Sequence, residues 1–429
     1  MNIQSVAAQN LEAAQNHIQF HHNPSDTKGW VTLAKKDPQT HKFYQYHYQP
    51  EELAHTLSQW TGEDVYISQN TFFKPQRRID NIKQLRTLFV DLDVYNLGYT
   101  PEWVLGKLEY EYFGEVIPDP NAVVLSGRGL VLVWNIEPIP YQAMPLWRAV
   151  ENYFAECLKD VGADTKATDP TRIFRLPGTI NSKSKAIVKA QYRHTHRYDI
   201  HQLQYDYLPE LTPSPIKKKP GRKSKIVRLF NIYTLHLSRA RDISKLVELR
   251  NGDVTNYREY ICFLYRYFTC CYTNNPERAL EETMDLNNEF LSPLPHREVV
   301  TATRSAEKAW EAKSNAKADE LAKAMGYPGA GYNLKNSKII EWLDISPEEQ
   351  QHLSTIIGPQ EKRRRNRIAK SEQRRADGVK TRKEYLSDAE KKRAHIRKAI
   401  EQNPEMSIRK LAQETGYSKS EIQRVKASL

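Results

Sequence analysis

The secondary structure favoured by the sequence changes once, near residue 210, and this change limits the folds open to the chain. Before it, short runs of β-branched and aromatic residues alternate with segments of helical apolar spacing. After it, the patterned segments are all helical in spacing. A length of 429 residues suits two or three domains. The sequence therefore predicts an α+β domain over residues 1–210, followed by helical regions.

Six runs in the first part are predicted to be strands because β-branched and aromatic residues dominate them and turn residues flank them. They are residues 30–34, 64–68, 87–94, 121–127, 130–136 and 186–193. The three segments between them with helical spacing are 50–60, 101–113 and 145–162.

Residues 211–225 contain three prolines, one glycine, six Lys/Arg and no acidic residue, which predicts an exposed basic linker. Residues 226–325 are predicted to be a helical domain, with 257–272 as its buried helix. Residues 326–386 are predicted to hold a helical segment, with a helix start at Ser346, and then an extended or loosely helical basic arm.

Residues 387–429 have the layout of a helix-turn-helix. We expect capping boxes at Ser387 and Ser418 and a turn at Gly416. A plain three-helix bundle would produce the same pattern, but residues 361–400 carry sixteen Lys/Arg against six Asp/Glu, which favours a DNA-binding domain. The residues expected to contact DNA are Arg363, Arg364, Arg365, Lys419, Gln423 and Arg424.

The remaining composition points to a reducing, cytoplasmic setting. The four cysteines form no CxxC pair and are predicted to be free. The N-terminus lacks the features of a secretion signal, and no apolar run reaches the ~18 residues that a membrane span needs.

Asp91 and Asp93 lie two residues apart in the apolar run 87–94, so both should face the same side of a strand. Carboxylates held this close repel each other unless a cation joins them, and Mg²⁺ or Mn²⁺ is the natural partner. By itself such a pair is weak, because it also occurs in nucleotide-sugar glycosyltransferases and at exposed strand ends.

Residues downstream complete a set suited to nucleotidyl transfer. The SGRG turn (126–129) brings Ser126 and backbone N–H groups that can face a phosphate. Residues 162–183 then supply a third carboxylate and three cations suited to a triphosphate. These are Asp164, Arg172, Arg175 and Lys183. A structural network of Asp–Arg ion pairs is the alternative explanation.

Together, LFVDLDV, SGRGLVLVW and GAD…TRIFRLPGTINSK resemble the three motifs of the archaeo-eukaryotic primase superfamily, in particular its plasmid and mobile-element branch. The resemblance covers roughly residues 60–195. It implies a palm with a sheet like that of the RNA-recognition motif, which uses Mg²⁺ or Mn²⁺ to join nucleoside triphosphates on a single-stranded DNA template.

The resemblance also implies roles for single residues. Asp91, Asp93 and Asp164 become the metal-binding catalytic carboxylates, with Asp169 as the competitor for the third place. Arg172, Arg175, Ser126 and Lys183 become contacts of the nucleotide phosphates. Val131 stands where family members often have a phosphate-binding histidine, and Arg128 is the candidate to supply the missing charge.

The rest of the chain resembles the regions that follow such a palm along the sequence in this superfamily. Residues 250–310 resemble the helical primase C-terminal domain, and the tail resembles the ends of plasmid replication proteins. The sequence has no GxxxxGK[ST] motif, so unwinding would fall to a host helicase.

The sequence leaves two interpretations: a primase-type replication protein that binds a duplex origin through its tail, or an origin-binding initiator without catalytic activity. A glycosyltransferase is disfavoured by the basic arm and the tail. A relaxase would need a histidine cluster with a catalytic tyrosine, and the isolated HHN at 21–23 does not suggest one.

Overall fold

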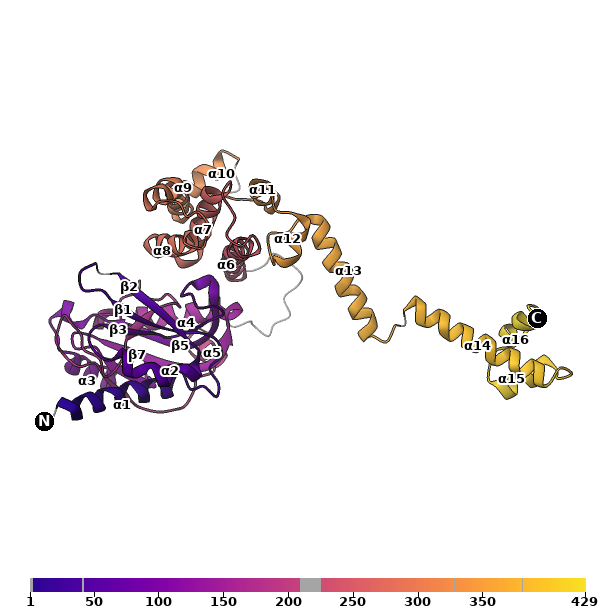
Figure 1. The fold of residues 1–429 in the computed structure, drawn as a ribbon, viewed down its shortest axis with the longest axis horizontal. Coiled ribbons are helices and arrows are strands. Elements are labelled where there is room, and N and C mark those ends of the chain that lie inside the picture. The colour runs from indigo at the N-terminus through magenta and orange to yellow at the C-terminus, as the bar shows by residue number, and fades with distance from the viewer. Residues whose placement is uncertain (1–2, 41, 209–224, 327–328, 380) are drawn as a thin grey trace. The chain divides into compact units, whose positions relative to one another are not determined.

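The computed structural model describes residues 3–40, 42–208, 225–326, 329–379 and 381–429 (Figure 1). The chain divides into two compact units, Met1–Ile356 and Ile357–Leu429. The predicted basic linker lies outside the described residues, apart from Lys225, where a helix begins. None of the described helices has both the length and the apolar character needed to cross a bilayer.

The first part of unit 1 contains two antiparallel sheets. One has the strand order β2-β1-β3-β8 and the other the order β4-β5-β7-β6-β9. The strands are β1 (Val31–Lys36), β2 (Phe43–Tyr48), β3 (Val65–Ser68), β4 (Thr71–Phe72), β5 (Ile82–Leu92), β6 (Ala122–Leu125), β7 (Leu130–Pro140), β8 (Ile173–Arg175) and β9 (Lys189–Tyr192). All six predicted strands form, and β2, β4 and β8 join them.

Five helices accompany the sheets: α1 (Ile3–His21), α2 (Pro50–Thr56), α3 (Pro101–Glu111), α4 (Met144–Cys157) and α5 (Ile200–Tyr207). Helix α4 packs on the central strand β5. Its apolar face buries Trp147, Val150 and Phe154, and the Trp147 indole donates a hydrogen bond to the Thr87 carbonyl at 2.8 Å. Helix α1 was not predicted, because its sequence is rich in alanine and polar residues and has a weak apolar face.

The second part of unit 1 is helical. It comprises α6 (Lys225–Leu249), α7 (Arg258–Thr273), α8 (Pro276–Asn287), α9 (His296–Ser314), α10 (Ala316–Ala324), α11 (Asn336–Trp342) and α12 (Pro347–His352). Helix α7 is the predicted buried helix, and it packs against α6, α8 and α9. Helix α12 begins as predicted, with a capping box between Ser346 and Glu349. The α+β class, with sheets first and helices after, is confirmed.

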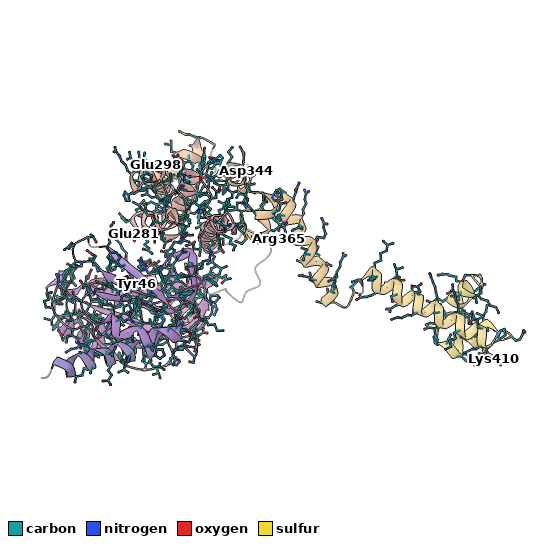
Figure 2. All side chains as sticks on the ribbon, viewed as in Figure 1. Tyr46, Glu281, Glu298, Asp344, Arg365 and Lys410 are labelled. Atoms are coloured by element: carbon teal, nitrogen blue, oxygen red, sulfur yellow. The ribbon has the colours of Figure 1, made fainter. Side chains whose placement is uncertain are left out.

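Unit 2 contains α13 (Pro359–Ala376), α14 (Arg382–Gln402), α15 (Ile408–Thr415) and α16 (Lys419–Lys426). Its core is formed by Ile396, Ile400, Leu411, Ile422 and Val425. The predicted turn at Gly416 and capping box at Ser418 are present. Figure 2 marks Lys410 on α15 and Arg365 on α13.

One prediction for unit 2 is wrong, and another left two forms open, of which the structure has one. Helix α14 begins at a capping box between Thr381 and Glu384, so Ser387 lies inside the helix instead of starting it. No helix-breaking residue separates Thr381 from Ser387, and the earlier cap therefore determines the start. For the basic arm, predicted to be extended or loosely helical, the structure has the helical form over residues 359–376, and Glu361 pairs with Arg364 and Arg365 one turn later.

Candidate nucleotide and metal site

Strand β5 carries the two carboxylates that the sequence singled out. Asp91 is the penultimate residue of β5, and Asp93 follows the end of the strand. In the ladder between β5 and β7, Asp91 is directly opposite Val131, whose side chain is buried. The neighbour of the Asp91 side chain on β7 is therefore apolar.

The backbone of residues 162–164 pairs with the end of β5. The Asp93 N–H donates to the Gly162 carbonyl at 2.9 Å, and the Asp164 N–H donates to the Asp91 carbonyl at 2.9 Å. This pairing brings Asp164 next to Asp91 and Asp93, although more than seventy residues separate them in the sequence. Three of the predicted site residues thus meet at one end of β5.

The SGRG turn lies against the same strand end, and both of its glycines are sterically required. Gly127 has φ +90°, and a Cβ at Gly129 would come within 2.5 Å of the Leu92 carbonyl oxygen. The Ser126 N–H and hydroxyl both bond the Gly129 carbonyl, and Asn181 bonds the Ser126 carbonyl at 2.6 Å. The turn is therefore fixed to the β5 end and to residues 181–184.

Uncompensated negative charge collects at this place. Burial, together with the Asp93 and Asp164 carboxylates, raises the pKa of Asp91 to about 6 against the opposing effect of Arg172 and Arg175. The pKa of Asp93 is raised by burial and by Asp164, while Arg172, Lys183 and Arg128 oppose this. These interactions show that the predicted carboxylates and cations share one electrostatic neighbourhood.

Arg172 is held only by long ion pairs. Its guanidinium lies 3.9 Å from an Asp164 oxygen and 3.7 Å from an Asp169 oxygen. Its buried Nε has no hydrogen-bond partner among the described residues. The side chain as a whole is 32% exposed, so its outer nitrogens can reach an anionic ligand.

Arg175 is held more firmly, by a residue that the sequence did not reveal. Its guanidinium lies 5.0 Å from the Tyr66 ring centre and donates to Asp64 at 3.2 Å. Burial opposes ionisation of Asp64, but hydrogen bonds from Ser182 and Arg175 keep its pKa below the ordinary value. A single aspartate before a strand carries no sequence signal for this role.

The remaining predicted contacts lie around the carboxylates. Lys183 is exposed, and its charge acts on Asp93. Arg128 is also exposed and stacks 4.4 Å from the centre of the Tyr95 ring. Ser126 is half-buried, and its hydroxyl donates to the Gly129 carbonyl within the turn at 3.0 Å.

Asp169, the competitor of Asp164, has a different environment. Its side chain is 14% exposed, and its Oδ1 accepts hydrogen bonds from the Thr171 N–H and hydroxyl. Burial opposes its ionisation, but Arg278, Arg172, Thr171 and Arg77 hold the pKa below its ordinary value. Asp169 therefore belongs to an internal ion-pair network, whereas Asp164 faces Asp91 and Asp93.

A second buried carboxylate lies beneath β5 and was not foreseen. Glu151 of α4 is fully buried and accepts hydrogen bonds from the Phe89 N–H at 3.1 and 3.3 Å. Burial raises its pKa well above the ordinary value. In the sequence it looks like one polar residue of an amphipathic helix.

As the side chains stand, the described residues contain no group of three or more His, Cys, Asp or Glu that could hold a metal ion. This covers the histidine pair at 21–22 as well. His21 bonds Asn135 at 2.8 Å, and His22 donates to the Ser68 carbonyl at 2.8 Å, so both are buried structural residues.

In unit 2, the predicted DNA contacts fall into two groups. Lys419, Gln423 and Arg424 are exposed on α16, and Arg363 is exposed on α13. Arg364 and Arg365 are partly occupied, because both donate hydrogen bonds to Glu361 at 2.6 to 2.9 Å.

Known proteins resemble this chain in structure and in sequence. No protein-family profile matches it. The AEP domain of the cyanophage S-2L primase-polymerase is 15% identical, with a TM-score of 0.36 over 46% of this chain and 97% of its own. The primase RepB′ is 12% identical, with a TM-score of 0.31 over 74% of this chain and 98% of its own. The catalytic domain of RepB′, solved with initiator DNA, is 15% identical, with a TM-score of 0.33 over 48% of this chain and 99% of its own.

A replication protein of Clostridium perfringens is 43% identical over 343 residues, which are 80% of this chain and 79% of that protein. The chain belongs to the family of replication proteins that includes this relative.

Proposed function

We propose that this chain is a replication protein of a plasmid or mobile element whose first part is a metal-dependent primase-type nucleotidyltransferase. The observation that carries the proposal is the meeting of Asp91, Asp93 and Asp164 at the end of β5, under the influence of Arg172 and Lys183. The reaction would be in-line attack of a 3′-hydroxyl on the α-phosphate of a nucleoside triphosphate, with loss of pyrophosphate.

The residues fit a divalent cation. Burial raises the pKa values of Asp91 and Asp93, and repulsion between the neighbouring carboxylates raises them further. A bound cation would offset both effects. Asp91, Asp93 and Asp164 would hold Mg²⁺ or Mn²⁺ after side-chain rotation. When bound, the ion would neutralise the charge that develops on the reacting phosphate.

Arg172 is the residue best suited to the triphosphate, because its side chain is 32% exposed and its ion pairs with Asp164 and Asp169 are 3.7 Å or longer. Arg175 is oriented by Asp64 and Tyr66, so its guanidinium would keep a fixed position as a second phosphate contact. Lys183, Arg128 and Ser126 would contribute further contacts from the edges of the site.

The tail would supply the second contact with DNA. Helices α15 and α16 with the turn at Gly416 would act as a helix-turn-helix, and the exposed cations of α16 would meet a duplex origin. Strand separation would come from a host helicase.

The activity can be tested by primer synthesis on single-stranded DNA with nucleoside triphosphates and Mn²⁺. Asp91→Ala/Asp93→Ala should reduce product to background, because both carboxylates next to the proposed ion are lost. Asp160→Ala is the matched control, since Asp160 is an exposed carboxylate four residues before Asp164. Equal product from wild type and the double variant would remove the enzymatic proposal.

The second candidate function is an origin-binding initiator without catalysis. It is favoured by one observation: buried Val131 stands opposite Asp91, where a phosphate-binding histidine is expected. Duplex binding by the full chain, together with no nucleotide incorporation by wild type, would support this candidate instead.

A further inference from the structure

The segment Thr165–Arg172, here called the Arg172 loop, connects the Asp164 carboxylate to β8. Within the first part of the chain, Arg77 and Asn70 hold its second half. Arg77 donates to the Thr171 carbonyl at 2.8 Å, and Asn70 donates to the Pro170 carbonyl at 2.9 Å. Both are backbone contacts, so they fix the path of the loop and leave the Thr171 side chain for another partner.

That partner comes from the helical part of unit 1. Arg278 of α8 donates from Nη2 to the Thr171 hydroxyl at 2.9 Å and to the Arg77 carbonyl at 3.3 Å. Its other contacts are with Glu281 at 2.8 Å and Glu282 at 3.3 Å, both on its own helix. Because Arg278 is almost fully buried, these acceptors hold its guanidinium in one place.

From Thr171 the contacts continue to Arg172. The Thr171 hydroxyl donates to Asp169 at 2.6 Å, and an Asp169 oxygen lies 3.7 Å from the Arg172 Nε. The Arg172 backbone N–H also bonds the Asp169 carbonyl at 3.2 Å. Arg278 is thus two side chains away from the guanidinium that lies next to the Asp164 carboxylate.

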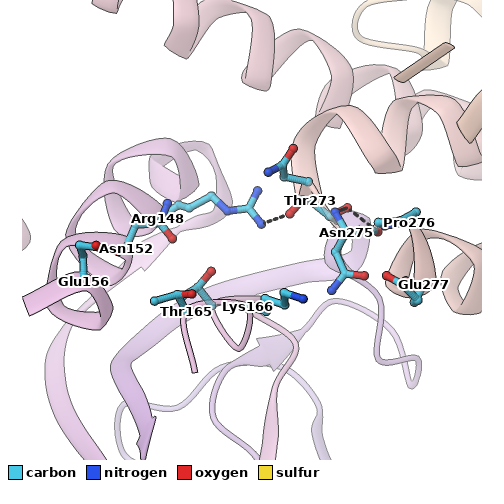
Figure 3. A pocket seen from close by; sticks show the side chains of 11 residues that line it. Arg148, Asn152, Glu156, Thr165, Lys166, Thr273, Asn275, Pro276 and Glu277 are labelled. Carbon is cyan, nitrogen blue, oxygen red and sulfur yellow. Dashed lines mark hydrogen bonds between the residues drawn. The ribbon is translucent and has the colours of Figure 1, made fainter. Parts of the chain in front are cut away.

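The first half of the loop borders a cavity. The cavity has a volume of about 530 Å³ and lies between α4, the loop and the turn from α7 to α8. The side chains that line it are drawn in Figure 3. Thr165, Lys166 and Thr168 line it from the loop. Across the cavity, Arg148 of α4 donates to the Thr273 carbonyl at 2.8 Å. Arg172 therefore lies in the half of the loop that Arg278 contacts, together with Arg77 and Asn70.

We propose that Arg278 is a positioning residue for the nucleotide site, through which the helical part of the chain orients Arg172. This deepens the proposed function and rests on it, because the ligand of Arg172 is taken to be the triphosphate of a nucleotide. Without the Arg278 guanidinium, the Thr171 hydroxyl loses its donor and Asp169 loses its strongest cationic neighbour. With one cation fewer around Asp169, its carboxylate would attract the Arg172 guanidinium more strongly. Arg172 would then turn toward Asp169 and away from the ligand.

Nucleotide affinity tests this without requiring turnover. The Kd of a fluorescent nucleoside triphosphate is measured with Mn²⁺ on the full chain and on Arg278→Gln. We expect affinity to fall about 10-fold, which corresponds to about 1.4 kcal/mol. A loss of stability by itself would not produce this result, since binding is measured below the unfolding temperature of each variant.

Arg266→Gln is the matched control. Arg266 of α7 is equally buried and is also held by a threonine hydroxyl and a glutamate, Thr303 at 2.7 Å and Glu307 at 2.7 Å, but both lie on α9. Because its guanidinium is held by α9 and not by the Arg172 loop, the Kd of this variant should stay within about twofold of wild type. Equal weakening by both variants would mean that Arg278 acts only through general stability.

A second variant addresses the same contact from the loop. Thr171→Val keeps the shape of the side chain and removes the hydroxyl, so it should weaken affinity in the same direction. The double variant Arg278→Gln/Thr171→Val should bind no more weakly than the worse single variant, because both substitutions break the same contact between Arg278 and Thr171. Additive losses would contradict the proposed route through Thr171.

The outcomes separate the two proposals. If wild type binds no nucleotide, the proposed function fails and the role of Arg278 fails with it. If wild type binds and Arg278→Gln binds equally well, the site stands and only the role of Arg278 is overturned.

Discussion

Asp91 and Val131 stand directly opposite each other on the neighbouring antiparallel strands β5 and β7. Side chains opposite each other in such a ladder extend to the same face of the sheet, with Cβ atoms about 4.5–5.5 Å apart. The residue at 131 therefore decides what lies beside the Asp91 carboxylate. Here it is an apolar, buried valine.

Val131→His should increase nucleotide affinity, because a histidine at this position would sit between the Asp91 carboxylate and an incoming phosphate. We expect the KM for nucleotide to fall about threefold to tenfold, at a cost of about 1–3 kcal/mol in stability for overpacking the strand pair. Steady-state primer synthesis and thermal unfolding measure the two effects. Val124→His is the control, since Val124 is the next residue in the same cross-strand row, one strand further from Asp91.

Asp91→Asn should stabilise the metal-free protein. The pKa of Asp91 is raised from 3.8 to about 6, so the folded state holds this proton more tightly than the unfolded state does. The stabilisation from the protonated carboxyl is therefore lost as pH rises through 6, and the ionised carboxylate opposes folding above that pH. At pH 7.5 with a chelator, the variant should gain about 1–3 kcal/mol in the free energy of unfolding, measured by denaturant titration. Mn²⁺ should raise the unfolding temperature of wild type and leave that of the variant nearly unchanged. A metal response of equal size in both proteins would argue against Asp91 as a ligand.

Asp164→Asn should lose activity, whereas Asp169→Asn should lose stability. Asp164 is 38% exposed and adds repulsion to Asp91, so its loss should abolish primer synthesis with little change in stability. Asp169 balances buried arginines, so its loss should destabilise by about 3–5 kcal/mol. Thermal unfolding and activity of both variants, measured side by side, check this. The opposite pattern would make Asp169 the third site carboxylate.

Acidification should destabilise unit 1 through its buried histidines. Burial lowers the pKa of His21 to about 4 and that of His22 to about 3, from 6.5 in an unfolded chain. The unfolded state therefore binds protons first, and the stability present above pH 6.5 is lost as pH falls toward 4. Between pH 7.5 and 5.0 each histidine should cost about 2 kcal/mol. His22→Gln can still donate to the Ser68 carbonyl but does not titrate, so its unfolding free energy should depend less steeply on pH.

Lys419→Ala/Arg424→Ala should weaken binding to duplex DNA. Both cations are exposed on α16, and each phosphate contact contributes about 0.9 to the slope of log affinity against log salt. We expect about 10-fold weaker binding at moderate salt and a slope reduced by about 2. Lys335→Ala/Lys338→Ala removes the same charge from α11 and its N-cap in unit 1 and should have little effect. A similar loss from both pairs would place the DNA contact elsewhere.

Local patterns in the sequence predicted many of the helices and strands of this protein, although not α1, β2, β4 and β8, and they singled out the candidate residues of its site. A strand alternates its faces every two residues, so the spacing alone linked Asp91 and Asp93, although β5 ends at Leu92 and Asp93 lies just beyond it. Helix starts at Ser346 and Ser418 also follow from neighbouring residues, because a cap bonds an N–H only three residues away. The same reasoning failed at Ser387, where an earlier cap at Thr381 had already begun the helix.

The tertiary structure decided which distant residues meet. Asp164 and Asp169 are five residues apart and chemically identical, yet backbone pairing brings one to Asp91, while Arg278 and Arg77 surround the other. Arg278 is 107 residues from Thr171, and Asp64 is 111 from Arg175. Such contacts depend on how whole sheets and helices pack, because burial and charge compensation act between neighbours in space. The sequence by itself determined the chemistry available to this chain, and packing determined which of those groups share a site.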